Sequence, residues 1–506
     1  MKRRWIIVLA GLFLFTWFIA AHAKTLIIGV EDDMVTLDPA DFSHRQTESA
    51  LRQIYEGLST YTPEREIVFE LAENIKPLDQ TTYEVKLRKD VRFHDGSPLT
   101  AQDVAFSINR LVKEGAMAGR TSERRGLLGP TKEAAAVDDY TVHIALESPW
   151  PLFPRFIPWQ MIVPHTVGDR YITAPVGTGP FIYEEWVRDS HFSVVKNQNY
   201  WGTEPALDKV VFRVIGEAPA RVAALRAGEI DIAAMVPMHE AKGLDNDPNI
   251  ELVEVMGTRS HFLELNYNKP PFDDIRVRKA INYALDIETA VQLLYEGRAT
   301  RIPNALSPQA FAYHEGLELY EYDPEKAQAL LVEAGHPNGF EFEIDVVDAY
   351  RSRAEIYQAM LQQVGIKAKI RTWPTLGAVR ETWMGAKQKP VSEQRDAFLN
   401  DWGNASLDPF DIIIPKFHSD AQGLGRGNFG GFNDPKVDAL LEASLIAATE
   451  EEREAIFKQV QEIIYACVPM VFEFVTHELH GVRNHVKNWR PSPDGRFHLG
   501  DVDIVK

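Results

Sequence analysis

The chain has 506 residues, of which 45% are hydrophobic and 25% charged, proportions typical of a folded globular protein. This length exceeds what one compact core organises, so two or three domains are expected. The formal net charge of −19 argues against nucleic acid or an anionic membrane as a partner, because both would repel the protein.

The N-terminus has the pattern of a secretory signal peptide. Basic residues at positions 2–4 precede an almost unbroken apolar run over residues 5–21, and Ala21 and Ala23 are small residues placed for cleavage. An uncleaved membrane anchor is the alternative, since about 17 apolar residues lie at the lower end of what spans a bilayer. The small residues favour cleavage after Ala23, and no cysteine follows for a lipid anchor. We therefore expect a soluble, exported protein.

The single cysteine, Cys467, cannot form an internal disulfide, so stability must come from burial of apolar groups. Its neighbours Ile463, Ile464, Val468 and Met470 are apolar, which favours a buried small hydrophobe over a nucleophile. After the signal peptide no window approaches 18 uncharged apolar residues, so no transmembrane span is predicted.

The first part of the mature chain mixes strand and helix signals. Residues 24–31 form an apolar run typical of a buried strand, and residues 46–56 have apolar side chains at helical spacing. Period-two alternation predicts strands at residues 82–88 and 140–147. Between these strands, a threonine N-cap predicts a helix over residues 100–112.

Two later regions each show a strand, helix, strand order. The first covers residues 210–233, and the second starts after residue 260. Two α/β regions imply two lobes, each on its own sheet. The expected elements of the second region are a helix capped by Asp273 or Asp274, strands at residues 340–347 and 366–372 around a helix at 352–364, and a helix opening at Asp434.

Two short motifs resemble cofactor or catalytic signatures but lie in the wrong context. The glycines of residues 425–430 fit a dinucleotide fingerprint, yet the next helix starts only at residue 434, so a flexible loop is the better interpretation. His477 and His480 are one residue short of a zinc-protease motif, and on a strand they point to opposite faces. The lack of any catalytic constellation favours binding.

The loop over residues 399–411 is the best candidate for a binding surface. Trp402 stands there among small residues and the polar side chains of Asn404, Ser406 and Asp408. An amphipathic ring beside convergent polar groups commonly lines small-molecule pockets. The alternative is that Trp402 only packs beneath its loop.

Several segments in the right order resemble the extracellular solute-binding protein family 5, the receptors of peptide, glutathione and nickel ABC importers. The resemblance covers essentially the whole mature chain. It implies an α/β fold, the two-lobed periplasmic binding protein fold (type II, large dipeptide-binding-like), with an extra strand-rich subdomain. The segments that carry it are residues 91–107, 177–181, 197–202, 224–231 and 266–280.

The resemblance also implies a domain division. The chain would cross between the lobes twice, near residues 257–268 and near residues 472–482. The expected parts are a signal peptide at 1–23, lobe I at 24–58, 177–260 and 483–506, a strand-rich subdomain at 59–176, and lobe II at 261–482.

Family anchor positions differ in this sequence. Peptide-binding members have an Asp three residues after a Trp, and this Asp pairs with the α-ammonium of the peptide. In this sequence the third residue after Trp402 is Ala405. Some dipeptide-binding members place an Arg just ahead of a Tyr, where the best alignment here gives Asp348 before Tyr350, with Arg351 after it. An unreplaced charge partner costs on the order of several kcal/mol, which argues against standard α-peptide recognition.

On the opposite lobe, the acidic contact of oligopeptide binders is replaced by the region of Ser43 and His44. The tail over residues 488–499 resembles that of glutathione-importer receptors. Trp402 would then supply a stacking face, Tyr350 and Arg351 one wall, and the polar residues of the Trp402 loop hydrogen bonds.

The resemblance implies a monomeric periplasmic substrate-binding protein of an ABC importer, without catalysis, cofactor or metal. Its partners would be a peptide-like small-molecule solute and a permease in the inner membrane, not nucleic acid. A receptor for a nickel chelate, haem, opine or small saccharide is the alternative within the binding class. An exported peptide hydrolase, and a sensor or chaperone docking on a membrane partner, are the alternatives from other classes.

Overall fold

The computed structural model describes residues 23–505 except residues 421–422. The expected signal peptide, apart from Ala23, lies outside the described residues. Within the described residues, none of the helices combines the length and apolar character needed to cross a bilayer.

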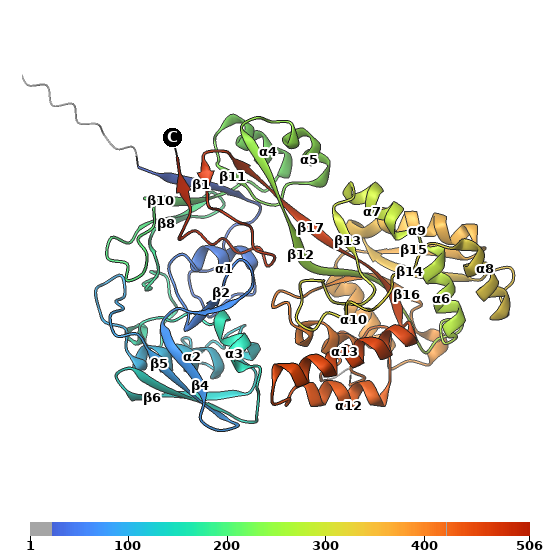
Figure 1. The fold of residues 1–506 in the computed structure, drawn as a ribbon, viewed down its shortest axis with the longest axis horizontal. Coiled ribbons are helices and arrows are strands. Elements are labelled where there is room, and N and C mark those ends of the chain that lie inside the picture. Colours follow the sequence, from blue (N-terminus) through green and yellow to red (C-terminus); the bar gives the residue numbers. More distant parts are fainter. Residues whose placement is uncertain (1–22, 421–422, 506) are drawn as a thin grey trace, which may run out of the picture.

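Two long strands, β12 (Ile250–Leu265) and β17 (Met470–Arg483), run from one lobe of the molecule into the other (Figure 1). They pair with each other in antiparallel fashion from Ile250 with Arg483 to Glu264 with Met470. The register shifts between Met256 and Ser260, near the middle of the pair. The two crossings therefore lie side by side.

Because β12 and β17 belong to both lobes, hydrogen bonding is continuous through one eleven-stranded sheet of the described chain, whereas the sequence predicts a separate sheet for each lobe. In order, the strands are β15 (Lys367–Trp373), β14 (Glu341–Val347), β16 (Ala397–Gly403), β12, β17, β11 (Ile232–Ala233), β1 (Thr25–Val30), β10 (Lys209–Val214), β9 (His191–Lys196) and β8 (Phe181–Val187), with β13 (Ala299–Arg301) added along β17.

The first lobe packs α1 (Arg45–Leu51), α4 (Ala218–Ala227) and α5 (Met238–Asp245) around its part of the sheet. Helix α1 is shorter than the predicted 46–56. The reason is tertiary, because the carbonyls of Gln53 and Ile54 accept hydrogen bonds from the main-chain N–H groups of Phe181 and Gly179. A Cβ at Gly177 would lie 2.0 Å from the Ile54 carbonyl oxygen, so this close approach requires glycine.

A strand-rich subdomain lies beneath the first lobe in Figure 1. The predicted strands at 82–88 and 140–147 and the helix at 100–112 are confirmed, and Thr100 and Asp103 form a capping box. The elements are the sheet β4 (Ala72–Pro77), β5 (Thr82–Leu87), β7 (Thr141–Leu146) and β6 (Thr131–Asp138), the hairpin β2 (Ser59–Tyr61) and β3 (Ile67–Phe69), and helices α2 (Ala101–Val112) and α3 (Phe153–Phe156).

The second lobe has the predicted strands β14 and β15 around a helix, and its helix α6 is capped by Asp274. Cys467 is half-buried, and burial raises the pKa of its thiol. The helices are α6 (Ile275–Ala284), α7 (Ile287–Tyr295), α8 (Pro324–Glu333), α9 (Arg351–Gln363), α10 (Leu376–Ala386), α11 (Ile413–Phe417), α12 (Pro435–Ser444) and α13 (Glu450–Cys467).

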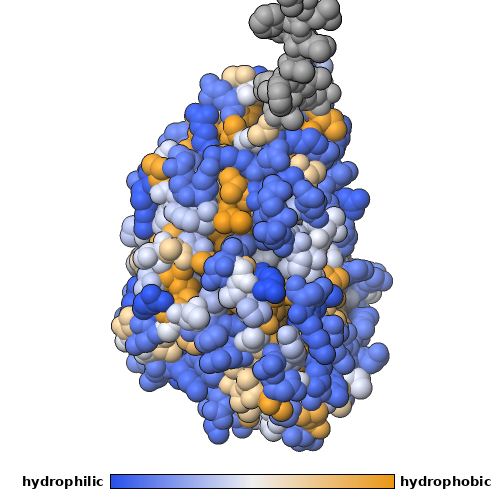
Figure 2. Space-filling view, turned by 90° about the vertical axis from the view of Figure 1, so that its left-hand side faces the viewer, coloured by the Kyte–Doolittle hydropathy of each residue, from blue (hydrophilic) through white to orange (hydrophobic). Residues whose placement is uncertain are grey.

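The lobes also touch where α3 approaches α13, in the lower part of Figure 1. The ring of Phe410 lies 5.2 Å from that of Phe156, and Arg155 donates to Glu450 at 2.7 Å. Seen from the left of Figure 1, the outer face of the molecule is mostly hydrophilic, with apolar residues in small separate groups (Figure 2). That face therefore has no broad apolar surface.

A buried ion pair ties the subdomain to the first lobe. Arg110 of α2 donates twice to Asp38, at 2.7 and 2.5 Å, and both side chains are essentially inaccessible. Asp38 also accepts from the main-chain N–H groups of Ala40 and Ile172. Removing one partner would leave a buried charge unpaired.

We predict that Asp38→Ala lowers the free energy of unfolding by about 3 to 5 kcal/mol in urea titrations, because Arg110 loses its partner. The double variant Asp38→Ala with Arg110→Met should recover part of the loss. Lys458→Ala, which breaks the exposed pair with Glu454, should cost less than about 1 kcal/mol. Equal effects of Asp38→Ala and Lys458→Ala would contradict the assignment.

Candidate functional site

A cavity of about 600 Å³ lies between the lobes and is lined by both of them. Thr258 and Arg259 of the crossing strand β12 form part of its wall. The other lining residues are Phe42–Arg45, Glu48, Glu123, Arg124, Gly126, Leu127, Trp159, Asp494 and Arg496 from the first lobe and its subdomain, and Gly403, Ala405 and Arg426 from the second lobe.

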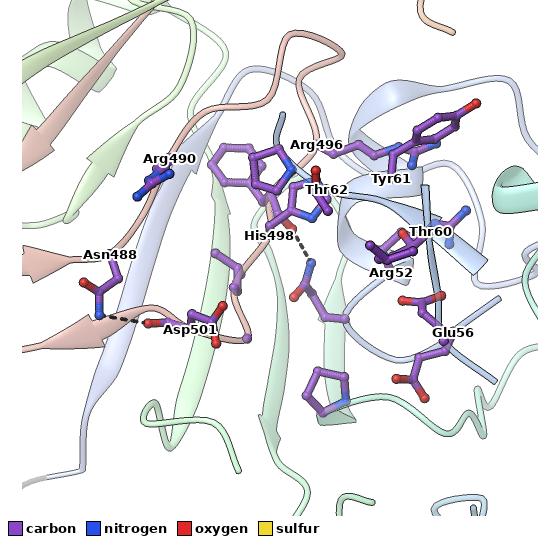
Figure 3. A pocket seen from close by; sticks show the side chains of 18 of the residues that line it. Arg52, Glu56, Thr60, Tyr61, Thr62, Asn488, Arg490, Arg496, His498 and Asp501 are labelled. Carbon is purple, nitrogen blue, oxygen red and sulfur yellow. Dashed lines mark hydrogen bonds between the residues drawn. The ribbon is translucent and has the colours of Figure 1, made fainter. Parts of the chain in front are cut away.

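A second cavity, of about 630 Å³, lies within the first lobe between the β2–β3 hairpin, the residues after α1 and the C-terminal segment (Figure 3). Arg52, Glu56, Tyr61 and His498 stand around it. It is slightly larger than the cavity between the lobes but has no lining residue from the second lobe. Only the cavity between the lobes can respond to their relative movement, so we take it as the candidate site.

Glu48 of α1 anchors a buried group of arginines on the first-lobe side. Its carboxylate lies 2.9 Å from Arg496, 3.6 Å from Arg52 and 3.9 Å from Arg124. Burial opposes ionisation of Glu48, but these three guanidinium groups hold its pKa below the ordinary value. Glu48 is therefore ionised at neutral pH.

Asp494 is the second carboxylate of this group. It pairs with Arg65 and, at 3.2 Å, with Arg496. Burial raises its pKa, but Arg496 and Arg65 outweigh that effect and lower the value to about 2. Ser492 donates to the same carboxylate at 2.7 Å.

Aromatic faces hold two of these guanidinium groups in place. Arg496 lies 4.0 Å from the ring centre of Trp159, and Arg124 lies 4.3 Å from that of Phe42. Arg124 also donates to the Trp159 carbonyl at 2.9 Å. Stacking of this kind fixes the planes of the guanidinium groups along the cavity wall.

On the second-lobe side, Arg259 donates to Asp401 at 2.6 Å while 49% of its side chain stays exposed. Tyr350 lies beside Asp401, and burial followed by the charge of Asp401 raises the pKa of its hydroxyl. Arg426 of the glycine-rich loop is exposed and forms no hydrogen bond or ion pair within the described chain. The loop thus carries a cation. The next helix, α12, begins only at Pro435, so the glycines do not open a helix as a dinucleotide fingerprint requires.

Trp402 packs within the second lobe and is not among the residues that line the cavity. Its indole N–H donates to the Asp411 carbonyl at 2.7 Å, and its ring lies 4.7 Å from the Lys416 ammonium. A Cβ at Gly427 would lie 2.7 Å from the ring, so the glycine-rich loop rests directly on it. Trp402 therefore supports the loop that carries Arg426.

The polar residues of the Trp402 loop have partners inside the loop or the lobe. Asn404 accepts from the Asp408 main-chain N–H at 3.1 Å, and Ser406 donates to Asp411. Asp408 accepts from Arg453 at 2.7 Å and is 1% exposed. These bonds shape the loop, and direct contact of Asn404, Ser406 or Asp408 with a solute stays a prediction.

The other expected site residues fall into two groups. Ser43, His44 and Ala405 line the cavity together, and the Ala405 carbonyl accepts from Arg65 of the opposite lobe at 2.9 Å. Asp348 and Arg351 are exposed, and Arg351 pairs with Glu355 at 2.9 Å. The structure does not bring Asp348 and Arg351 to the cavity wall.

Sequence reasoning missed the arginines of the cavity. Arg124, Arg259 and Arg496 come from distant segments and have no common spacing, so no local pattern marks them as a group. Only the tail over residues 488–499, which contains Asp494 and Arg496, carried a usable signal. Within the described chain, no group of three or more His, Cys, Asp or Glu side chains is placed to hold a metal ion.

The two histidines of the motif near the C-terminus have separate environments. His477 shares hydrogen bonds with Thr300 and Glu254. His480 is buried, with its ring 5.4 Å from that of Trp489, and burial lowers its pKa to about 4. They do not converge on one point.

The chain was compared with protein families and with known proteins. The model of the bacterial extracellular solute-binding proteins, family 5 Middle, matches residues 66–423. Heme-binding protein A of Haemophilus influenzae is 28% identical over 78% of this chain and 76% of that protein. Glutathione-binding protein GsiB of Pectobacterium atrosepticum is 27% identical over 96% of this chain and 95% of that protein. The solved structure of HbpA2 from Haemophilus parasuis has a TM-score of 0.85 and 26% identity, covering 96% of this chain and all of that one.

The lowered pKa of Asp494 predicts a specific pH dependence of stability. Because its folded value of about 2 lies below the ordinary 3.8, its contribution is complete above about pH 5 and is lost as the pH falls through 2. We predict that the stability difference between the protein and Asp494→Asn shrinks by about 2 kcal/mol between pH 5 and pH 2 in denaturant titrations. A difference that is constant over this range would contradict the assignment.

Proposed function

The chain belongs to the bacterial extracellular solute-binding proteins of family 5, and we propose that it captures a small peptide or peptide-like solute between its lobes and delivers it to an ABC permease in the inner membrane. Cleavage after Ala23 would release it into the periplasm as a monomer. The observation that carries the proposal is the cavity lined by both lobes and by the crossing strand β12.

A cavity between the lobes couples solute binding to closure of the lobes. A solute between Glu48–Arg496 on one side and Arg259–Arg426 on the other makes more contacts when the lobes approach. Such differential contact shifts the population toward the closed arrangement, and the crossing strands allow the rotation. The permease would recognise the closed form. The proposed parts are lobe I at 24–58, 177–260 and 483–506, its subdomain at 59–176, and lobe II at 261–482.

The character of the walls favours a peptide-like solute over a macrocycle. A volume of about 600 Å³ lies within the range of small-molecule sites. The aromatic side chains of the lining are those of Phe42 and Trp159, whereas charged side chains form the largest group. A haem needs broad apolar walls and an axial ligand to its iron. Among the described residues that line the cavity, His44 is the one histidine. Glutathione, the solute named for one relative, combines peptide bonds with carboxylates that suit arginines.

The proposal excludes turnover of the bound solute. We predict that calorimetry with glutathione and with short peptides detects binding to the purified protein. Mass spectrometry of the same mixtures after long incubation should recover each ligand intact. Cleavage at a rate proportional to protein concentration would support the alternative of an exported peptide hydrolase.

Substitution of Trp402 tests the role of the glycine-rich loop, residues 425–430, which carries Arg426 on the second-lobe side of the cavity. We predict that Trp402→Ala weakens solute binding by more than about 1 kcal/mol, because the ring supports the loop with Arg426. Trp186→Ala, in the first lobe and hydrogen-bonded to Asp33, is the matched control and should leave affinity unchanged. Unchanged affinity of Trp402→Ala with a lowered melting temperature would assign the ring to packing alone.

A further inference from the structure

We propose that the cleft selects solutes with at least two carboxylate groups, one held by the arginines of the first lobe and the other by those of the second. This inference rests on the proposed function, since it names the class of solute that the same cleft takes. In the first lobe the receiving side chains are Arg124 and Arg496. On the second-lobe side they are Arg426 and Arg259, which stands on the crossing strand β12 and is held by Asp401 of the second lobe.

The first lobe buries more positive than negative charge in one connected group of side chains. Arg124 and Arg496 bring this group to the cavity between the lobes, and Arg52, Glu70 and Arg496 also line the first-lobe cavity. Even with Glu70 near Arg52 counted as ionised, guanidinium groups outnumber carboxylates by four to three. Glu56 adds no charge at neutral pH, because burial and then Glu70 raise its pKa to about 8. The groups are Arg52, Arg65, Arg124 and Arg496 against Glu48, Asp494 and Glu70.

A buried excess of cationic charge is unfavourable unless an anion lies close to it. Arg496 donates to Glu48 from one terminal nitrogen and pairs with Asp494 through Nε at 3.2 Å, while its other terminal nitrogen is buried without a hydrogen-bond partner in the described chain. Arg124 donates its hydrogen bond to a neutral carbonyl, that of Trp159, and its ion pair with Glu48 is long, at 3.9 Å. A carboxylate entering the cavity would supply the missing anion at this wall.

Two more guanidinium groups face the cavity from the other side, Arg259 on the crossing strand β12 and Arg426 in the second lobe. Arg259 has one carboxylate partner, Asp401, and keeps half of its side chain exposed. Arg426 is exposed and forms no hydrogen bond or ion pair within the described chain, and its charge acts to lower the pKa of the buried Asp411. Glu123, from the first lobe, is the acidic side chain of the lining that stands outside the buried group.

The cavity as a whole is positive in an acidic protein. Five arginines line it against three acids, an excess of two positive charges, while the chain carries a net charge of −19. At physiological salt the Debye length is about 8 Å, so the charges of distant surface acids are largely screened at the cavity. The arginines that line the cavity therefore determine the charge of the solute that binds. Two carboxylates on one solute would bridge the lobes and couple charge recognition to closure.

Isothermal titration calorimetry with glutathione, which has two carboxylates, and with its diethyl ester, which has none, tests this inference. We expect the diester to bind at least about tenfold more weakly. Arg426→Gln should weaken glutathione binding by about tenfold and leave the affinity for the diester unchanged. Arg371→Gln removes another exposed arginine of the second lobe, which pairs with Glu343 outside the cavity, and should change neither affinity.

Equal or tighter binding of the diester would overturn the inference and leave the proposed function standing. If neither probe binds, the inference is tested on the solute that is released from protein purified from its own host, by counting its carboxyl groups. A solute with two or more carboxyl groups supports the inference, and one with fewer overturns it. Turnover of the solute would instead count against the proposed function.

Discussion

The pairing of β12 with β17 is the constraint on which the rest of the molecule depends. Two neighbouring antiparallel strands carry the chain between lobes, so the lobes can rotate about the pair but cannot slide apart without breaking its ladder. The register shifts at Met256 and Ser260 put the least regular part of the pair at the crossing. Thr258 and Arg259, which lie in that part, also line the cavity. The least regular part of the strand pair and the cavity wall therefore share one segment of β12, residues 256–260.

The side chains that line the cleft carry a net positive charge, whereas the whole chain carries a net negative charge. Glu48 and Asp494 stay ionised because arginines surround them, and those arginines in turn lie against Trp159 and Phe42. The pairs therefore do not neutralise the wall. A rigid, aromatic-backed set of guanidinium groups is well suited to carboxylates, since the planar fork matches their geometry. The absence of an acid at Ala405, where Arg65 instead contacts the main chain, fits the same preference.

Local patterns in the sequence predicted much of the fold and less of the site. The alternation at 82–88 and the Thr100 cap act within a few residues, so both elements form as expected. Helix α1 ends before residue 56 because the main-chain N–H groups of Gly179 and Phe181 donate to the carbonyl oxygens of Ile54 and Gln53, which follow it. In the loop, Asn404, Ser406 and Asp408 look like ligand contacts, yet the same side chains make turn and ion-pair bonds. Arg124, Arg259 and Arg496 converge only through tertiary structure, which no spacing encodes.

The most direct test of the account is a crystal structure of the protein purified from its own host with any retained solute. The account predicts electron density for an intact organic solute between Arg496 and Arg259, contacting both lobes. Density confined to the first-lobe cavity near Arg52 and His498, or a solute held by one lobe alone, would contradict it.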